Sequence, residues 1–185
     1  MAKECMLDLE TLDSTPSSAV IAIGAVIFDP ADASGYKEID RYYTVVDPRS
    51  CVSAGLTIGT DTVMWWMEQS EQARSQFFKD RPKSKLVDAL DGFAAFLAKH
   101  TDTRGNIRVW GNGASFDNVI LGNAYRALGK PQPWKFWNDM CYRTLKNLMP
   151  SVELRRGGTY HRADDDAATQ AEHLYRIWQQ LLQGR

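Results

Sequence analysis

Met6-Leu7-Asp8-Leu9-Glu10-Thr11-Leu12 places two carboxylates two residues apart, at the end of a short apolar run near the N-terminus. In a β-strand, residues i and i+2 project from the same face, so we expect Asp8 and Glu10 to lie side by side. Neighbouring anions repel, and a fold tolerates them best where a cation neutralises them. Mg²⁺ accepts carboxylate oxygens as ligands. The stretch therefore indicates either a metal-binding strand or an exposed edge strand with two solvated acids, and more distant residues decide between them.

The composition is that of one globular domain without a strong electrostatic bias. The chain has 185 residues, of which 44% are hydrophobic and 24% charged, and this suits a single domain over residues 1–185 with a sizeable core. The net charge of -1 argues against binding of nucleic acid by bulk positive charge, but it allows an enzyme that grips a strand end through metal ions.

The cysteines and the apolar stretches bear on where the protein works. Cys5, Cys51 and Cys141 lack a short metal-binding spacing and are expected to be reduced thiols in a cytoplasmic protein. The N-terminus has no basic segment followed by a long apolar stretch, so no signal peptide is expected. No stretch is long enough to span a membrane, and we expect no membrane partner.

The first half of the chain contains three expected strands, over residues 5–9, 19–29 and 40–46. The second is a nearly continuous apolar run rich in β-branched residues, which is typical of a buried central strand. The short connections favour an antiparallel meander.

The second half alternates helices and strands. We expect helices over residues 61–69, 85–100, 116–128, 141–148 and 164–182, strands over 106–110 and 136–140, and an irregular segment over 47–59. Ser115 is expected to cap the third of these helices, Gly129 to end it, and Asp164 to cap the last one. A hairpin unit followed by this alternation predicts an α/β domain with a mixed sheet.

Acidic residues occur in three places where a strand ends or a helix begins. They are Asp8 with Glu10, Asp117, and the run 164–166, which His161 closely precedes. Phosphodiester cleavage by two metal ions needs several carboxylates to hold the ions roughly 3.5–4 Å apart. Histidine, with an unperturbed pKa of about 6.5, suits the base that takes a proton from the attacking water. Taken alone, His161 is better explained as a surface loop residue.

These three places resemble the motifs of the DnaQ-like exonucleases that have a DEDDh active site. The segment 8–11 (Asp-Leu-Glu-Thr) resembles the first motif, and 112–117 (Asn-Gly-Ala-Ser-Phe-Asp) is similar to the second. The segment 161–167 (His-Arg-Ala-Asp-Asp-Asp-Ala) resembles the third, in which His precedes the last Asp by five residues and an Ala follows. The small size and the Trp65-Trp66 pair further resemble the compact phage- and prophage-type and mycobacterial 3′–5′ exonucleases, some of them labelled exonuclease VIII-like.

The resemblance implies a ribonuclease H-like fold, with a mixed five-stranded sheet whose first three strands are antiparallel and which helices flank. It implies that His161 is the general base and that two divalent ions, Mg²⁺ or Mn²⁺, are bound by Asp8, Glu10, Asp117 and Asp166. Asp165 would replace Asp166 as a ligand only if the start of the last helix shifted by one residue.

The implied activity is 3′–5′ exonucleolytic hydrolysis of single-stranded DNA or RNA, with release of nucleoside 5′-monophosphates. Thr11 and Leu12 would lie beside the terminal nucleotide, and Asn112 and Phe116 would shape the cleft. Bases would stack on apolar side chains without sequence preference, and the candidates are Leu12, Trp66 and Phe116. Phosphates would meet cations near the third motif, although Arg155, Arg156 and Arg162 are equally well explained as solvated surface residues.

Two tryptophans at adjacent positions of a helix point in different directions. One of Trp65 and Trp66 is expected in the core, and the other either lines a cleft or also packs in the core.

Other functions remain as alternatives. A ribonuclease H or integrase-type nuclease would also use acids and metal ions, but it would not require a histidine five residues before the last aspartate. A non-catalytic nucleic-acid-binding module on the same fold would tolerate loss of ligands, yet every expected ligand position holds a suitable residue. A structural protein stabilised by metal is a third alternative. Related nucleases are often dimers, so a homodimer is among the expected partners.

Overall fold

A five-stranded mixed sheet forms the centre of the computed structural model, which describes residues 3–77, 82–102 and 106–183. In spatial order the strands are β3 (Glu38–Val45), β2 (Val20–Phe28), β1 (Glu4–Thr11), β4 (Arg108–Gly111) and β5 (Asp139–Cys141). β2 pairs antiparallel with both β1 and β3, whereas β4 joins β1 and β5 joins β4 in parallel. The predicted α/β class and the antiparallel arrangement of the first three strands are confirmed.

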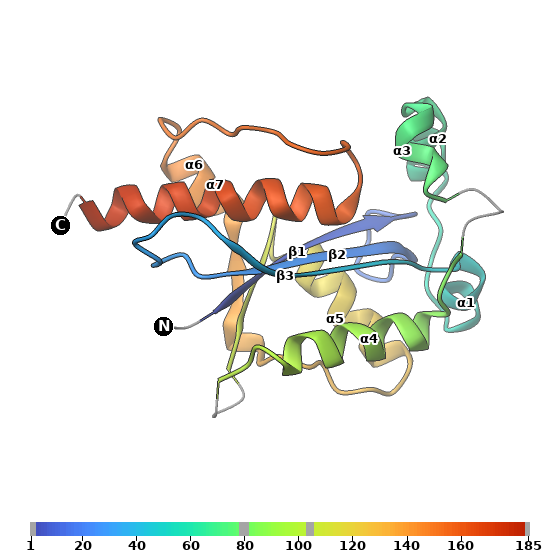
Figure 1. The fold of residues 1–185 in the computed structure, drawn as a ribbon. Helices are drawn as coiled ribbons and strands as arrows, with labels where there is room; N and C mark the ends of the chain where they lie inside the picture. The colour runs from blue at the N-terminus through green and yellow to red at the C-terminus, as the bar shows by residue number, and fades with distance from the viewer. Residues whose placement is uncertain (1–2, 78–81, 103–105, 184–185) are drawn as a thin grey trace.

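Helices cover both faces of the sheet (Figure 1). The two on one face are α6 (Tyr142–Leu148) and α7 (Ala163–Gln183), and α4 (Leu86–Ala98) and α5 (Asp117–Ala127) lie on the other. Between β3 and α4 the chain forms α1 (Pro48–Ser53), α2 (Thr60–Glu68) and α3 (Glu71–Ser75). Among these helices, as far as the structure describes them, none is long and apolar enough to cross a bilayer.

β1 separates the two layers through its alternating side chains. Leu7 and Leu9 join the core beneath α4 and α5, whereas Met6 packs with residues of α7 on the opposite face. Asp8 and Glu10 follow the register of Met6, so they project toward α7. The central strand therefore carries its carboxylates on the α7 side of the sheet.

Several local predictions were wrong. The segment expected as strand 136–140 begins as a 3₁₀ turn over Phe136–Asn138, and pairing starts only at Asp139. The Asp139 carboxylate accepts hydrogen bonds from Trp134 Nε1 at 2.7 Å and Asn118 Nδ2 at 2.9 Å, which anchor the strand at this residue.

The segment 47–59, expected to be irregular, contains α1. Asp47 accepts a hydrogen bond from the backbone N–H of Arg49, and Pro48 occupies the first helical turn. Both are ordinary helix-start signals, but the helix is only six residues long and has too little periodicity to be recognised.

Candidate active site

The end of β1 brings the first two acids together. Glu10 is buried, and Asp8 is half-buried beside α7. Asp8 Oδ1 accepts a hydrogen bond of 2.7 Å from Gln170 Nε2, which projects from α7. The strand therefore presents both carboxylates to the first two turns of the last helix.

Asp117 reaches the same place because β1 is longer than its neighbour. β4 ends at Gly111, opposite Leu7, and beyond this point the edge of β1 has no partner strand on that side. The backbone N–H of Leu9 instead donates to Asp117 Oδ1 at 3.2 Å. A Cβ atom at Gly111 would lie 3.0 Å from Asp117 Oδ2, so the glycine permits this close approach.

The start of α5 differs from the predicted one. Phe116, not Ser115, is the N-cap residue, and no side chain caps the helix. Gly113, with φ of 116°, allows a tight turn in which the N–H of Phe116 donates to the carbonyl of Gly113 at 2.7 Å. The turn leaves Asp117 as the first residue of the helix, with its carboxylate free to face β1. The predicted end of the helix at Gly129 is confirmed by its φ of 64°.

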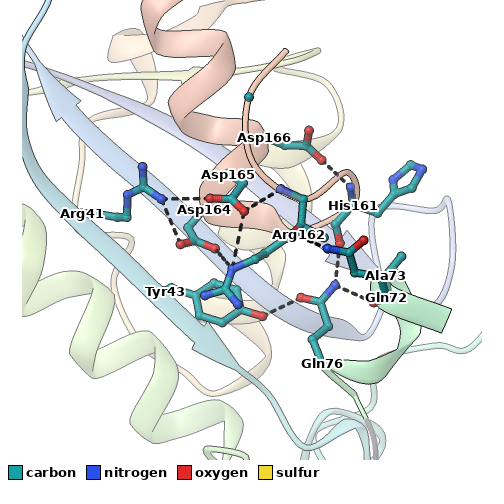
Figure 2. Close-up of polar contacts among 12 residues, drawn as sticks. Arg41, Tyr43, Gln72, Ala73, Gln76, His161, Arg162, Asp164, Asp165 and Asp166 are labelled. Atoms are coloured by element: carbon teal, nitrogen blue, oxygen red, sulfur yellow. Dashed lines mark hydrogen bonds and ion pairs between the residues drawn. The ribbon is translucent and has the colours of Figure 1, made fainter. Parts of the chain in front are cut away.

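The three consecutive aspartates at the start of α7 have different partners (Figure 2). Asp164 was predicted to cap the helix, but it is the second helical residue, and its carboxylate accepts from Arg162 Nε at 2.8 Å and Arg41 Nη1 at 3.3 Å. Asp165 accepts from Arg41 Nη1 at 3.1 Å and from the N–H of Thr159 at 2.8 Å. Arg41 lies on β3, so a residue distant in sequence forms ion pairs with both Asp164 and Asp165.

Asp166 faces the other way, toward β1. Its Oδ2 accepts a 2.9 Å hydrogen bond from the backbone N–H of His161, and its Oδ1 lies 3.2 Å from Arg156 Nη1. Asp166 is 8% exposed. Of the three aspartates, Asp166 is therefore the one that joins Glu10.

His161 lies next to these acids in an aromatic surrounding. One ring nitrogen of His161, one carboxylate oxygen of Glu10 and one of Asp166 lie within 4.8 Å of one another. The imidazole contacts Trp65 edge-on, with 4.9 Å between ring centroids, and its centroid lies 3.8 Å from that of Tyr160. The ring is thus held between apolar side chains and a carboxylate cluster.

The cluster is electrostatically costly as it stands. Burial raises the pKa of Asp117 to about 7. Burial, and then repulsion from neighbouring carboxylates, raises the pKa values of Asp8 and Glu10 well above their usual range. Burial also raises the pKa of Asp166, although its hydrogen bond from the His161 N–H and the nearby Arg156 favour the charged form.

A divalent cation fits this set of side chains. The donors are carboxylate oxygens and one imidazole, which hard divalent ions accept. Gln170 Oε1 is buried and, among the described residues, has no hydrogen-bond partner, while the Nε2 of the same amide donates to Asp8. A bound cation would remove the repulsion that raises the carboxylate pKa values.

Comparison with known proteins identifies the family. Residues 3–178 match the model of the 3′-5′ exoribonuclease Rv2179c-like domain. The chain belongs to the Rv2179c-like family. The matched domain is a 3′–5′ exoribonuclease domain, so the chain is a 3′–5′ exonuclease.

Individual relatives agree with this assignment. An exodeoxyribonuclease of Enterobacteria phage T4 is 27% identical over 168 residues, which cover 75% of this Rv2179c-like chain and 68% of the phage protein. The solved nuclease domain of 3′hExo, a DEDDh family member bound to rAMP, superposes with a TM-score of 0.62 at 16% identity and covers 96% of this chain and 92% of its own. Cell-death related nuclease 4 superposes with a TM-score of 0.57, also at 16% identity, over 97% of this chain and 64% of that one. These likenesses confirm the ribonuclease H-like fold.

The residues predicted to bind substrate fall into different surroundings in the Rv2179c-like domain. A pocket beside Glu10 is lined by Thr11 and Phe116 together with Trp65. Leu12 lines a neighbouring apolar pocket. Asn112 has a buried Oδ1 without a partner among the described residues, and its carbonyl accepts from Arg143.

The two tryptophans divide as the helix geometry predicts, although both line the pocket beside Glu10. Trp66 is 7% exposed, packs with Ile21 and Ala73, and donates from Nε1 to the carbonyl of Thr11 at 2.8 Å. Trp65 is 41% exposed and touches His161. Trp65 therefore presents the free indole surface, and adjacency in sequence carries no signal that would have separated the two.

Two of the three candidate phosphate-binding arginines already contact carboxylates and aromatic rings of the protein. Arg162 pairs with Asp164 and lies over the ring of Tyr43, and Arg156 pairs with Asp166 and lies over that of Tyr160. Arg155 is exposed. Gln170 was missed, although its position four residues after Asp166 places it on the same helix face.

Proposed function

We propose that this exonuclease hydrolyses single-stranded nucleic acid from the 3′ end and releases nucleoside 5′-monophosphates, by a two-metal mechanism with His161 as the general base. The observation that carries the proposal is the convergence of three separate segments, the end of β1, the start of α5 and the start of α7, on one buried group of carboxylates. Burying several carboxylates together does not stabilise the fold. Phosphodiester hydrolysis by two metal ions requires such a group to hold the ions.

The carboxylates of the site would hold the ions, with Mg²⁺ and Mn²⁺ as the candidates. In the proposal the ligands are Asp8, Glu10, Asp117 and Asp166. The bound ions would lower the pKa of the attacking water and stabilise charge on the phosphoryl and leaving oxygens. Gln170 would orient Asp8 through the hydrogen bond that it donates.

His161 would accept the proton of the attacking water at a ring nitrogen. Burial and the nearby Arg156 lower the pKa of His161 below its ordinary value, so the imidazole is neutral at physiological pH and its lone pair is available. The N–H of its own backbone is bound to Asp166, which fixes the loop relative to one ligand.

The same proximity would allow His161 to act as a metal ligand. The two roles predict different results for His161→Asn. If His161 is only the general base, the variant should lose activity and keep its metal affinity. If His161 is a metal ligand, the variant should lose metal affinity as well.

The strand end would enter beside Trp65. This indole and Phe116 line the pocket next to Glu10, and exposed aromatic surfaces hold single strands by stacking without sequence preference. The family description names an exoribonuclease, and the phage relative is an exodeoxyribonuclease, so both RNA and DNA are proposed substrates.

A single domain over residues 1–185, a cytoplasmic location and a homodimer complete the proposal. Three free cysteines support the reducing environment. Sedimentation of the purified protein would give the oligomeric state.

The deciding experiment uses 5′-labelled and 3′-labelled single-stranded DNA and RNA oligonucleotides with Mg²⁺, Mn²⁺ or a chelator. We expect stepwise shortening from the 3′ end that needs metal, and His161→Asn should be slower by about 100-fold or more. His100→Asn is the matched control, because His100 binds Asp40 away from the site.

Folding of each variant is checked by circular dichroism. Metal-independent binding without shortening, in a folded sample, would contradict the proposal and favour a non-catalytic nucleic-acid-binding module. The ratio of DNA to RNA rates gives the preferred sugar.

A further inference from the structure

His161 has an unusual backbone conformation. It is the one non-glycine residue with positive φ in the described ranges, at 59°. The left-handed region is unfavourable for a residue with a Cβ atom, and such a conformation persists only where the surroundings enforce it. The two hydrogen bonds of the His161 peptide groups show what enforces it.

One of these bonds comes from α7, and the other comes from outside the catalytic motifs. The His161 N–H donates to Asp166, and the His161 carbonyl accepts from Gln76 Nε2 at 2.5 Å. Gln76 directly follows α3 (Figure 2). The loop that carries His161 is therefore held between α7 on one side and α3 on the other.

The orientation of the Gln76 amide is fixed by three partners. Its Nε2 also donates to the carbonyl of Ala73 at 2.8 Å, and its Oε1 accepts from the Tyr43 hydroxyl at 2.5 Å. Two carbonyl acceptors require the NH₂ group on their side, so a flipped amide would lose both bonds. Gln76 therefore cannot exchange its donor for its acceptor toward His161.

The same helical unit also holds the end of β1. Trp66 of α2 donates from its indole nitrogen to the carbonyl of Thr11, one residue beyond Glu10. Trp65, its neighbour, touches the His161 ring. The segment α2–α3 thus connects the strand that carries two carboxylates with the loop that carries the histidine.

We propose that Gln76, oriented by Tyr43, is a positioning residue that holds the His161 peptide in its left-handed conformation and thereby aims the imidazole at the carboxylate cluster. The proposal rests on the function proposed above for His161. Gln76 touches no reacting atom, and its effect on the reaction passes through His161.

The test compares Gln76→Ala, the isosteric Gln76→Glu and Tyr43→Phe in the single-strand exonuclease assay. Gln76→Ala should lower kcat by about tenfold or more with little change in KM, because small displacements of a catalytic group are costly. Gln76→Glu should lose at least as much, since it sets a carboxylate oxygen against two carbonyls. Tyr43→Phe, which keeps the ring beneath Arg162, should lose less.

Gln72→Ala is the matched control. Gln72 lies on α3 and donates to the same loop, but to the side-chain hydroxyl of Thr159 at 3.1 Å rather than to His161. It should retain parental kcat. Equal losses in Gln72→Ala and Gln76→Ala would mean that general attachment of the loop matters, and would overturn the specific role of Gln76.

A double variant separates positioning from loss of structure. In a His161→Asn background, Gln76→Ala should cause no further loss of kcat, because the group that it positions is gone. The same fold-loss in both backgrounds, or no loss in the parental background, would overturn the proposal.

A readout independent of turnover keeps the two proposals distinguishable. The chain has three histidines, so the ring protons of His161 can be followed by NMR, and Trp65 and Tyr160 should shift them strongly. In Gln76→Ala these shifts should move toward those of a free histidine while those of His100 and His173 stay. Unchanged shifts would overturn the positioning role, whereas shifted resonances in a protein with no exonuclease activity would overturn only the function proposed for His161.

Discussion

At the scale of single residues, the site concentrates charge where water is scarce. Asp117 is 3% exposed, and burial raises its pKa to about 7. An acid whose pKa is raised on folding binds more protons in the folded than in the unfolded state between the two pKa values. Metal-free protein should therefore lose stability as the pH rises from about 4 to about 7.

Asp117→Asn should relieve this cost. The amide oxygen can still accept from the Leu9 N–H, while the charge is removed, so we expect the metal-free variant to gain on the order of 1 kcal/mol or more at pH 8. The gain should shrink toward pH 4, where the parental carboxyl is already protonated. Chemical denaturation at several pH values in chelator measures it.

Asp88→Asn serves as the control, because Asp88 also lies in the first turn of a helix but is exposed. It should change stability little at any of these pH values. A destabilised Asp117→Asn at pH 8 would show that the carboxylate is favoured in the metal-free site. Exonuclease activity of Asp117→Asn should be lost in either case.

The sequence predicted the roles of some residues in the site but gave no indication of others. The motif spacing favoured Asp166 among three aspartates, and the structure places Asp166 beside Glu10. The partners of Asp164 and Asp165 include Arg41, more than one hundred residues earlier, and no local pattern indicates such a contact.

At the scale of elements, the site depends on how closely α7 approaches the sheet. Gly24 on β2 faces the first turn of α7, and a Cβ atom there would lie 2.1 Å from the Ala163 carbonyl carbon and 2.2 Å from the Asp164 nitrogen. Backbone atoms have little freedom to retreat. The glycine therefore sets the distance between the helix that carries Asp166 and the strand pair that carries Asp8.

Gly24→Ala should push the start of α7 away from β1. We expect a loss of about 1–3 kcal/mol of stability from overpacking, together with a loss of exonuclease activity larger than the loss of folded protein explains. Gly157→Ala is the matched control, since a Cβ atom there would meet nothing within 4 Å. Thermal unfolding and kcat measured on both variants check this, and an unchanged Gly24→Ala would show that α7 can shift at no cost.

Long periodic elements were predictable and short ones were not. The apolar runs of β1 and β2 and the helical spacing in α4 decide their own structure through burial. α1, α3 and β5 have between three and six residues, and tertiary contacts such as those of Asp139 determine them.

At the scale of the whole molecule, folding and metal binding should be coupled. Ions that bind the folded site, but not the unfolded chain, stabilise by an amount that grows with their concentration, about 2.7 kcal/mol at one hundred times Kd. We expect Mg²⁺ or Mn²⁺ to raise Tm relative to chelator, and to do so more at pH 8 than at pH 5, because protonated carboxylates bind cations poorly.

Differential scanning calorimetry of the parent and of Asp8→Asn tests this coupling. The variant should show little metal-dependent rise in Tm. An equal rise in both proteins would place the stabilising ion outside the carboxylate cluster.

The site joins nearly opposite ends of the chain, from Asp8 on the first strand to Asp166 and Gln170 on the last helix. During synthesis β1, β2 and β3 leave the ribosome first and can pair early, because their contacts are close in sequence. The cluster stays incomplete until α7 has been made. A growing chain that lacks α7 therefore holds Asp8, Glu10 and Asp117 without Asp166, and the proposed nuclease site can form only after α7 has been synthesised.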